Sequence, residues 1–123
     1  MNAFLVDTNI IILHVGNIEA VNFETYDISI SELSVFELLR YPKLSRHEET
    51  AIKTLLNTCT RIPVTSNISQ RAAHIARTKQ GRGMDFLIAA TALELDVPLI
   101  TKNTKDFRGI PGLLVQETIM QRS

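Results

Sequence analysis

The stretch AFLVDTNIIIL, residues 3–13, indicates the fold class of this chain. Phe4–Val6 is short and wholly apolar, which is typical of a strand buried on both faces. Asp7 and Thr8 are residue types that cap helix N-termini, and the apolar residues 10–13 continue as a helix. A strand that passes at once into a helix is the repeating unit of parallel α/β sheets. It also leaves a carboxylate, Asp7, at the end of the strand.

The alternation of strand and helix continues along the rest of the chain. Short apolar or alternating runs predict further strands at residues 26–30, 62–64, 99–100 and 113–115. Helices are predicted at residues 31–39, 45–58, from a cap at Ser66 or Asn67 to 79, and from Asp85 to 96. Residues 18–25 could form a helical turn or a loop. We therefore predict an α/β fold, with three α/β/α layers around a central, mainly parallel sheet of four to five strands, in one domain spanning residues 1–123.

Composition and charge restrict the possible partners and surroundings. The 123 residues carry 13 basic and 13 acidic side chains, so a nucleic-acid partner must be attracted by a local basic patch and metal ions. The single cysteine, Cys59, excludes an intrachain disulfide and a multi-cysteine zinc site, and we expect it in the core. No apolar run reaches the roughly 18 residues that span a membrane, and the start lacks a signal-peptide pattern. We expect a soluble, cytoplasmic protein without a membrane partner.

Acidic residues stand where open parallel sheets bind their ligands, beyond the carboxyl ends of the strands. Asp7 ends the first strand, and Asp106 follows the fourth. Asp85 starts a helix that runs back from that edge, and Glu37 interrupts an otherwise apolar helix. Singly, each has an ordinary explanation: Asp7 and Asp85 as helix caps worth about 1 kcal/mol each, Glu37 as a partner of Arg40, and Asp106 as a loop residue.

Taken together, carboxylates at one edge of a sheet repel one another unless cations lie between them. An oxygen-rich site without cysteine suits Mg²⁺ or Mn²⁺. The sequence therefore predicts a divalent metal site at this edge.

Four stretches occur in an order and spacing that resemble the PIN domain, and more specifically the short toxin ribonucleases of prokaryotic VapBC toxin–antitoxin pairs. They are VDTN at 6–9, SVFELL at 34–39, DFLIAATA at 85–92 and LITKNTKDF at 99–107, the last two being the most specific. The resemblance covers essentially the whole chain. It implies a PIN-like fold and a metal-dependent endoribonuclease that cleaves single-stranded RNA with Mg²⁺ (or Mn²⁺). It also implies a small VapB-like antitoxin as partner. A homodimer is implied as well, and residues 10–13 and 33–39 could supply its apolar contact surface.

By position, the resemblance makes Asp7, Glu37 and Asp85 the acidic catalytic and metal site. Residues expected to support this site are Thr8, Asn9 and Thr101. Many family members have an aspartate where this chain has Asn103, which offers only a neutral oxygen. Asp106, three residues on, is the candidate to complete the catalytic and metal set in its place.

Basic residues flank the same stretches and are candidates for RNA binding. They are Lys79, Arg82, Lys102, Lys105 and Arg108. Each alone is an ordinary solvated charge, whereas a cluster of them around the acidic edge would form a track for phosphates.

Some competing functions need residues that the chain lacks, and one is suggested by Asn103, which departs from the aspartate of many family members. A HAD-type phosphatase needs a second aspartate at position 9, which is Asn9 here, and a receiver domain needs one at the end of strand three, which reads Val64–Ser66. A PIN nuclease of RNA processing or quality control is a further alternative, although such domains usually lie inside longer chains. The serious non-enzyme alternative is a catalytically impaired PIN-like module that binds RNA or protein, supported by Asn103. Metal-dependent cleavage that disappears in Asp7→Asn separates the enzyme from the binding module.

Overall fold

The computed structural model of the chain describes residues 3–16 and 25–118. Within them one five-stranded sheet has the order β3-β2-β1-β4-β5, and every pair of neighbours is parallel. The strands are β1 Ala3–Val6, β2 Asp27–Ser31, β3 Thr60–Ile62, β4 Leu99–Ile100 and β5 Val115–Gln116. The prediction of a central parallel sheet is confirmed, with parallel pairing throughout.

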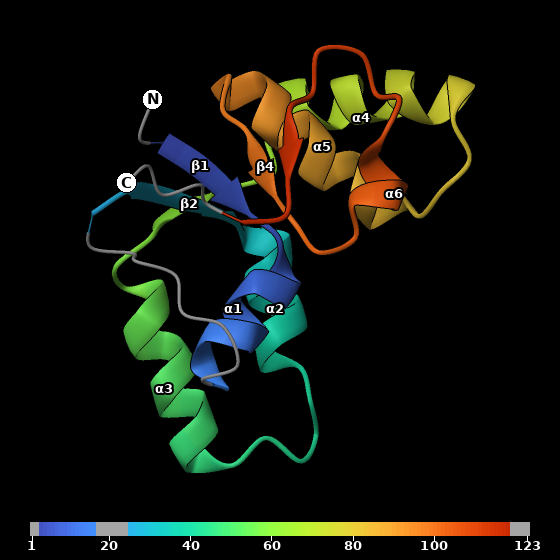
Figure 1. Cartoon of the computed structure of the whole chain (residues 1–123). Helices are drawn as coiled ribbons and strands as arrows, with labels where there is room; N and C mark the ends of the chain where they lie inside the picture. The colour runs from blue at the N-terminus through green and yellow to red at the C-terminus, as the bar shows by residue number, and fades with distance from the viewer. Residues whose placement is uncertain (1–2, 17–24, 119–123) are drawn as a thin grey trace.

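Helices cover both faces of this sheet, which confirms the three layers (Figure 1). They are α1 Thr8–Val15, α2 Glu32–Leu39, α3 Arg46–Leu56, α4 Ser66–Thr78, α5 Gly83–Leu95 and α6 Thr104–Phe107. Helices α1, α2 and α3 lie on one side of the sheet, and α4, α5 and α6 lie on the other. None of the helices in the described ranges is long and apolar enough to cross a membrane.

Strand β1 lies at the centre because its side chains are apolar toward both layers. Phe4 and Val6 pack into the core cluster that β2 shares with α1, α2 and α3. Leu5, between them, packs into the opposite cluster with residues of α5, including Ile88. Alternate residues of a strand point to opposite faces, so this short strand connects both halves of the core.

Helix α5 is apolar on nearly every side because it lies between the sheet and α4. Ala89 and Ala92 join the cluster that contains β1 and β4. Phe86 and Ala90 join a third cluster with Ile68 of α4. The small alanines allow close packing of α5 on both neighbours.

The edge strands were predicted two residues away from their positions. Strand β3 is Thr60–Ile62 rather than 62–64, because its register pairs it with residues 29–31 of β2. At this edge Thr60 and Arg61 are exposed, so β3 lacks the apolar run that identified the inner strands. Strand β5 begins at Val115, where the prediction ended, because it pairs with Leu99 there.

Two helix starts also differ from the prediction. The cap of α4 is Thr65 rather than Ser66 or Asn67, and its side chain accepts a hydrogen bond from the Ile68 backbone N–H at 3.2 Å. Helix α5 begins at Gly83 after Arg82, so Asp85 lies in the first turn and is not its cap. The alternative of a helical turn or a loop at residues 18–25 falls, apart from Thr25, outside the described residues.

Candidate active site

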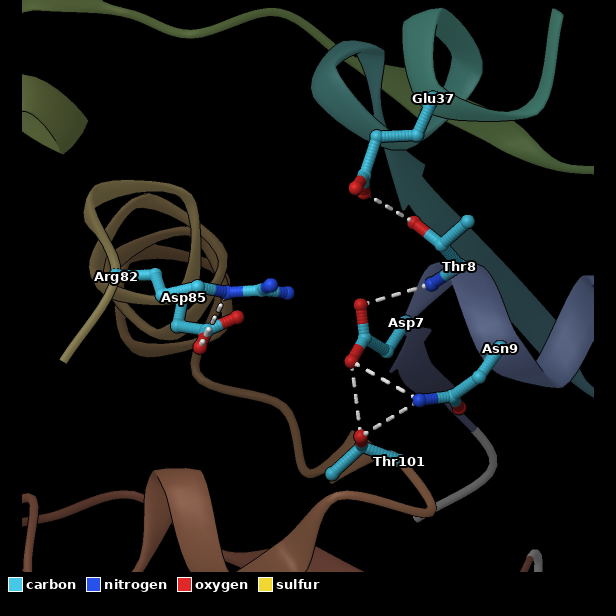
Figure 2. A network of polar contacts seen from close by, with 7 residues as sticks. All are labelled: Asp7, Thr8, Asn9, Glu37, Arg82, Asp85 and Thr101. Atoms are coloured by element: carbon cyan, nitrogen blue, oxygen red, sulfur yellow. Dashed lines mark hydrogen bonds and ion pairs between the residues drawn. The ribbon is translucent and has the colours of Figure 1, made fainter. Parts of the chain in front are cut away.

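Asp7 lies at the carboxyl end of β1 and anchors the candidate site. Its side chain is buried, with 7% of the residue exposed. Oδ1 accepts a hydrogen bond from the Thr8 backbone N–H at 2.8 Å, and Oδ2 accepts one from Thr101 Oγ1 at 2.9 Å. Figure 2 shows the carboxylate held between these two residues. Asp7 therefore caps α1 and at the same time presents a carboxylate at the sheet edge.

Asn9 and Thr101 connect the β1–α1 junction to the segment after β4. Asn9 Nδ2 lies 3.4 Å from Thr101 Oγ1, and Asn9 Oδ1 accepts a hydrogen bond from the Lys102 backbone N–H at 3.2 Å. Thr101 Oγ1 also accepts a hydrogen bond from the Asn103 backbone N–H at 3.0 Å. The three residues expected to support the site, Thr8, Asn9 and Thr101, all surround Asp7.

Glu37 reaches the same place from α2. Its Oε1 accepts a hydrogen bond from Thr8 Oγ1 at 2.7 Å, and Figure 2 shows the carboxylate directed toward the Asp7 side of the cavity. The predicted pairing of Glu37 with Arg40 is wrong, because the ion pairs among the described residues do not include these two side chains. The Arg40 guanidinium lies 5.7 Å from the centroid of the Tyr41 ring.

Asp85 faces Asp7 from the first turn of α5 (Figure 2). Its Oδ2 lies 3.9 Å from Arg82 Nε. Asp7, Glu37 and Asp85 line one cavity of about 160 Å³, together with Asn103. We call this the acidic cavity. The structure thus brings three carboxylates from separate elements to one place.

Asp106 is placed apart from the other predicted carboxylates. It lies on α6 and lines a neighbouring cavity of about 530 Å³ with Asp85 and Asn103. It is not among the residues that line the acidic cavity, although its charge acts on Asp85. Its role as a metal ligand stays a prediction.

Burial and mutual repulsion raise the pKa of two site carboxyls. The pKa of Asp7 is raised mainly by burial and further by Glu37, against the hydrogen bonds from Thr101 and Thr8. The pKa of Asp85 is raised by burial, and by Asp7, Asp106 and Glu37, while Arg82 lowers it. The carboxylates therefore interact across the cavity, and a cation placed among them would relieve the repulsion.

The donor set fits a hard divalent cation in its chemistry. Carboxylate oxygens of Asp7, Glu37 and Asp85, with the amide oxygen of Asn103, are the ligand types that Mg²⁺ and Mn²⁺ prefer. No three His, Cys, Asp or Glu side chains of residues 3–16 and 25–118 approach closely enough to share an ion. Arg82 also lines this cavity, its side chain extends between Asp85 and Asp7 in Figure 2, and its positive charge lowers the pKa of both carboxyls.

The basic candidates divide into two groups. Lys79, Arg82 and Lys105 line the neighbouring cavity, whereas Lys102 and Arg108 line neither cavity. The presence of Arg82 in the acidic cavity as well was not predicted.

Four further residues that line the acidic cavity were missed: Ile12, Tyr41, Met84 and Ile88. The sequence offered Ile12 only as part of an apolar helix and Tyr41 only as a helix end, and neither context signals a site residue.

Comparison with known proteins identifies the family and agrees with the fold. The model of the PIN domain family matches residues 4–113. Ribonuclease VapC19 of Mycobacterium tuberculosis is 35% identical over 92 residues, which cover 71% of this chain and 72% of that protein. A toxin–antitoxin complex from Klebsiella pneumoniae contains a chain with a TM-score of 0.75 and 29% identity, matched over 94% of this chain and 98% of that one. The structure of VapBC-1 from nontypeable Haemophilus influenzae gives a TM-score of 0.76 and 26% identity, over 93% of this chain and 96% of that one.

Proposed function

The chain belongs to the PIN domain family, and on that premise we propose that it is an endoribonuclease that cleaves single-stranded RNA, the toxin of a VapBC-type toxin–antitoxin pair. The observation that carries the proposal is the meeting of Asp7, Glu37 and Asp85 in one small cavity at the carboxyl edge of the sheet. The similarity to Ribonuclease VapC19 supports RNA as the substrate.

For hydrolysis of a phosphodiester at this cavity we propose a divalent cation, Mg²⁺ or Mn²⁺, that Asp7, Glu37 and Asp85 would hold, with Asn103 as a neutral oxygen. The three carboxylates would have to move closer together around such an ion than they stand in this structure. Such an ion, when bound, lowers the pKa of a coordinated water and neutralises charge on the phosphate. The hydrogen bonds of Thr8 and Thr101 to Asp7 favour its ionised form, which ligation requires. Thr8 also orients Glu37, so one residue positions two of the three carboxylates.

A small VapB-like antitoxin is the proposed protein partner, supported by the similarity to chains in toxin–antitoxin complexes. An apolar cavity of about 510 Å³ between α1, α3 and the segment after α2 would suit an apolar segment of such a partner. Ile12 and Tyr41 line both this cavity and the acidic one. A partner seated there would therefore lie beside the carboxylates.

The test is cleavage of mixed-sequence single-stranded RNA with Mg²⁺, Mn²⁺ or EDTA. Wild type is compared with Asp7→Asn and with the matched control Asp27→Asn, whose exposed carboxylate begins β2 at the opposite edge of the sheet. We expect cutting by wild type and Asp27→Asn only with metal, and at least about 100-fold slower cutting by Asp7→Asn.

Equal cutting by wild type and Asp7→Asn would refute the assignment of the site. The second candidate function is an impaired PIN-like module that binds RNA or protein, which Asn103 in the acidic cavity favours. RNA binding by a folded wild type without cleavage under any metal would support that module. Restored cutting in Asn103→Asp would then identify the missing carboxylate as the cause.

A further inference from the structure

Three cations line the cavity next to the acidic one. Lys79 ends α4, Arg82 precedes α5 and Lys105 lies on α6, so they converge from separate places in the chain. The cavity also contains Asp85 and Asp106, which leaves three positive against two negative side chains. The lining side chains are otherwise polar or absent, from Gln80, Gly81 and Asn103, and none of the eight is aromatic. Such a cavity suits a phosphate and offers no surface for stacking a base.

The two cavities share a wall made of Arg82, Asp85 and Asn103. A phosphate bound in the basic cavity would therefore lie beside the group bound among the carboxylates. Successive phosphates of one nucleic-acid strand also lie side by side, as groups bound in these two cavities would. The arrangement fits one strand that crosses this wall.

Of the three residues in the shared wall, Arg82 is the cation, so it can contact an anion in either cavity. Its side chain is 80% exposed, and its Nε stands 3.9 Å from Asp85 Oδ2, at the outer limit of an ion pair. The Asp85 side chain is only 17% exposed, but the contact is long and the guanidinium itself lies in solvent. The pair therefore holds Arg82 weakly, and the guanidinium can exchange Asp85 for another anion. Arginine also matches phosphate oxygens with paired donors.

The turn that carries Arg82 is held in place by a close backbone contact. A Cβ added at Gly81 would stand 3.1 Å from Cζ of Phe86, which is buried. The absence of a side chain at position 81 therefore lets the turn lie against the Phe86 ring. This close approach fixes the starting point of Arg82 at the shared wall, while its side chain is exposed to solvent.

We propose that the cavity lined by Lys79, Arg82 and Lys105 binds the RNA phosphate next to the scissile one, an inference that rests on the proposed function. When RNA binds, Arg82 moves from Asp85 to this phosphate. In the free protein Arg82 is the counter-ion of Asp85. When RNA binds, Arg82 leaves Asp85, whose carboxylate becomes available to the reaction. The Arg82 side chain thereby links binding of a phosphate in the basic cavity to release of the Asp85 carboxylate.

Steady-state cleavage of the mixed RNA tests the subsite. Lys79→Gln and Lys105→Gln are each expected to raise KM about three- to tenfold with kcat unchanged, as for loss of one contact to a charged group at an exposed site. The slope of log affinity against log salt should fall by about 0.7 for each. The control Arg77→Gln, which removes an exposed cation from the same end of α4 but not from the cavity, should change neither.

A single uncharged methylphosphonate, moved along a defined oligoribonucleotide, tests the exchange of Arg82. Binding is measured in Mg²⁺ on the Asp7→Asn background, to prevent cutting. We expect one methylphosphonate position beside the scissile phosphate to weaken binding about three- to tenfold, and this loss to vanish when Arg82→Gln is added. The same loss with and without Arg82 would overturn the exchange.

The results separate the two proposals. Wild type that cuts RNA while the lysine variants keep their KM and salt slope refutes the subsite alone. Wild type that neither cuts nor binds RNA, with or without metal, refutes the nuclease and the subsite together.

Discussion

Asp7 is a buried carboxylate whose environment acts on it in two opposite directions. Burial raises its pKa, while hydrogen bonds from Thr101 and the Thr8 backbone lower it. The hydrogen bonds therefore offset part of the rise in pKa that burial causes, and the groups that donate them also fix the orientation of the carboxyl. A ligand for a metal ion has to be deprotonated, so these hydrogen bonds should influence metal affinity as well as stability.

Thr101→Val should separate these contributions. Valine keeps the shape but removes the hydroxyl that donates to Asp7 and accepts from Asn103 N–H. We expect the free energy of unfolding to fall by about 1–3 kcal/mol and the acid limb of the cleavage profile to move to higher pH, because the pKa of Asp7 rises further. Urea unfolding and a pH–rate profile measure the two effects. Thr101→Ser, which keeps the hydroxyl, should resemble wild type, and equal profiles for valine and serine would contradict this role.

The raised carboxyl pKa values make stability depend on pH. Above the ordinary aspartic pKa of about 3.9 and up to the raised values of Asp7 and Asp85, these two carboxyls bind more protons in the folded protein than in the unfolded chain. In this window the free energy of unfolding therefore falls as pH rises, and the carboxyls cause no loss below it. Without divalent cations, Asp7→Asn should gain stability relative to wild type as pH rises through the window, measured by urea unfolding at a series of pH values. A difference between the two proteins that does not change with pH would contradict this.

At the scale of the elements, the site depends on where α5 begins. The helix starts at Gly83, which places Asp85 in its first turn and Arg82 at the junction with α4. Gly81 and Gly83 flank Arg82 but have different surroundings. Only at position 81 would a side chain meet a close neighbour, Phe86.

Gly81→Ala and Gly83→Ala therefore form a matched pair. Alanine at 81 would stand 3.1 Å from the buried Phe86 ring, so the ring or the turn has to shift slightly, and we expect weaker RNA binding and lower stability. Alanine at 83 meets nothing within 4 Å and should stabilise the protein by about 0.4–1 kcal/mol without weakening RNA binding. Thermal unfolding and RNA titration of both variants test this, and equal effects at the two positions would count against it.

Sequence patterns identified the inner elements better than the outer ones, for physical reasons. Phe4–Val6 is recognisable because both of its faces are buried, and the apolar helix at 83–95 for the same reason. Strand β3 was misplaced because an exposed edge tolerates Thr60 and Arg61, and only pairing with β2 defines it.

The same distinction holds for the site. In a parallel sheet the carboxyl end of β1 and the N-terminus of α5 lie at the same edge, so Asp7 and Asp85 could be expected to lie close together. The place of Arg82 between them depends on side-chain direction in a turn, which no periodicity encodes. The separation of Asp106 from the acidic cavity likewise depends on the four-residue helix α6, whose orientation the sequence does not specify.

For the molecule as a whole, the exposed apolar side chains indicate where a second copy would bind. Phe36 on α2 is 64% exposed, and Leu114 before β5 is 66% exposed. The homodimer predicted from residues 10–13 and 33–39 would bury Phe36 and leave Leu114 in solvent. We expect Phe36→Asp to convert a dimer to a monomer in sedimentation experiments, and Leu114→Asp to leave the dimer intact. Dissociation by Leu114→Asp alone would move the interface to the other end of the sheet.

The order of the strands has a consequence for how the protein is made. Strand β1 is translated before the other four strands, yet it lies at the centre of the sheet and pairs with β4, which is translated only after β2 and β3. Asp7 and Glu37 are likewise synthesised long before Asp85 and Thr101 join them. Such distant pairings form only after the later segment is available. A message cut short before Leu99 would therefore yield a fragment without a sealed core or a complete acidic cavity, so the site would be assembled only after β4 and the segment that follows it have been translated.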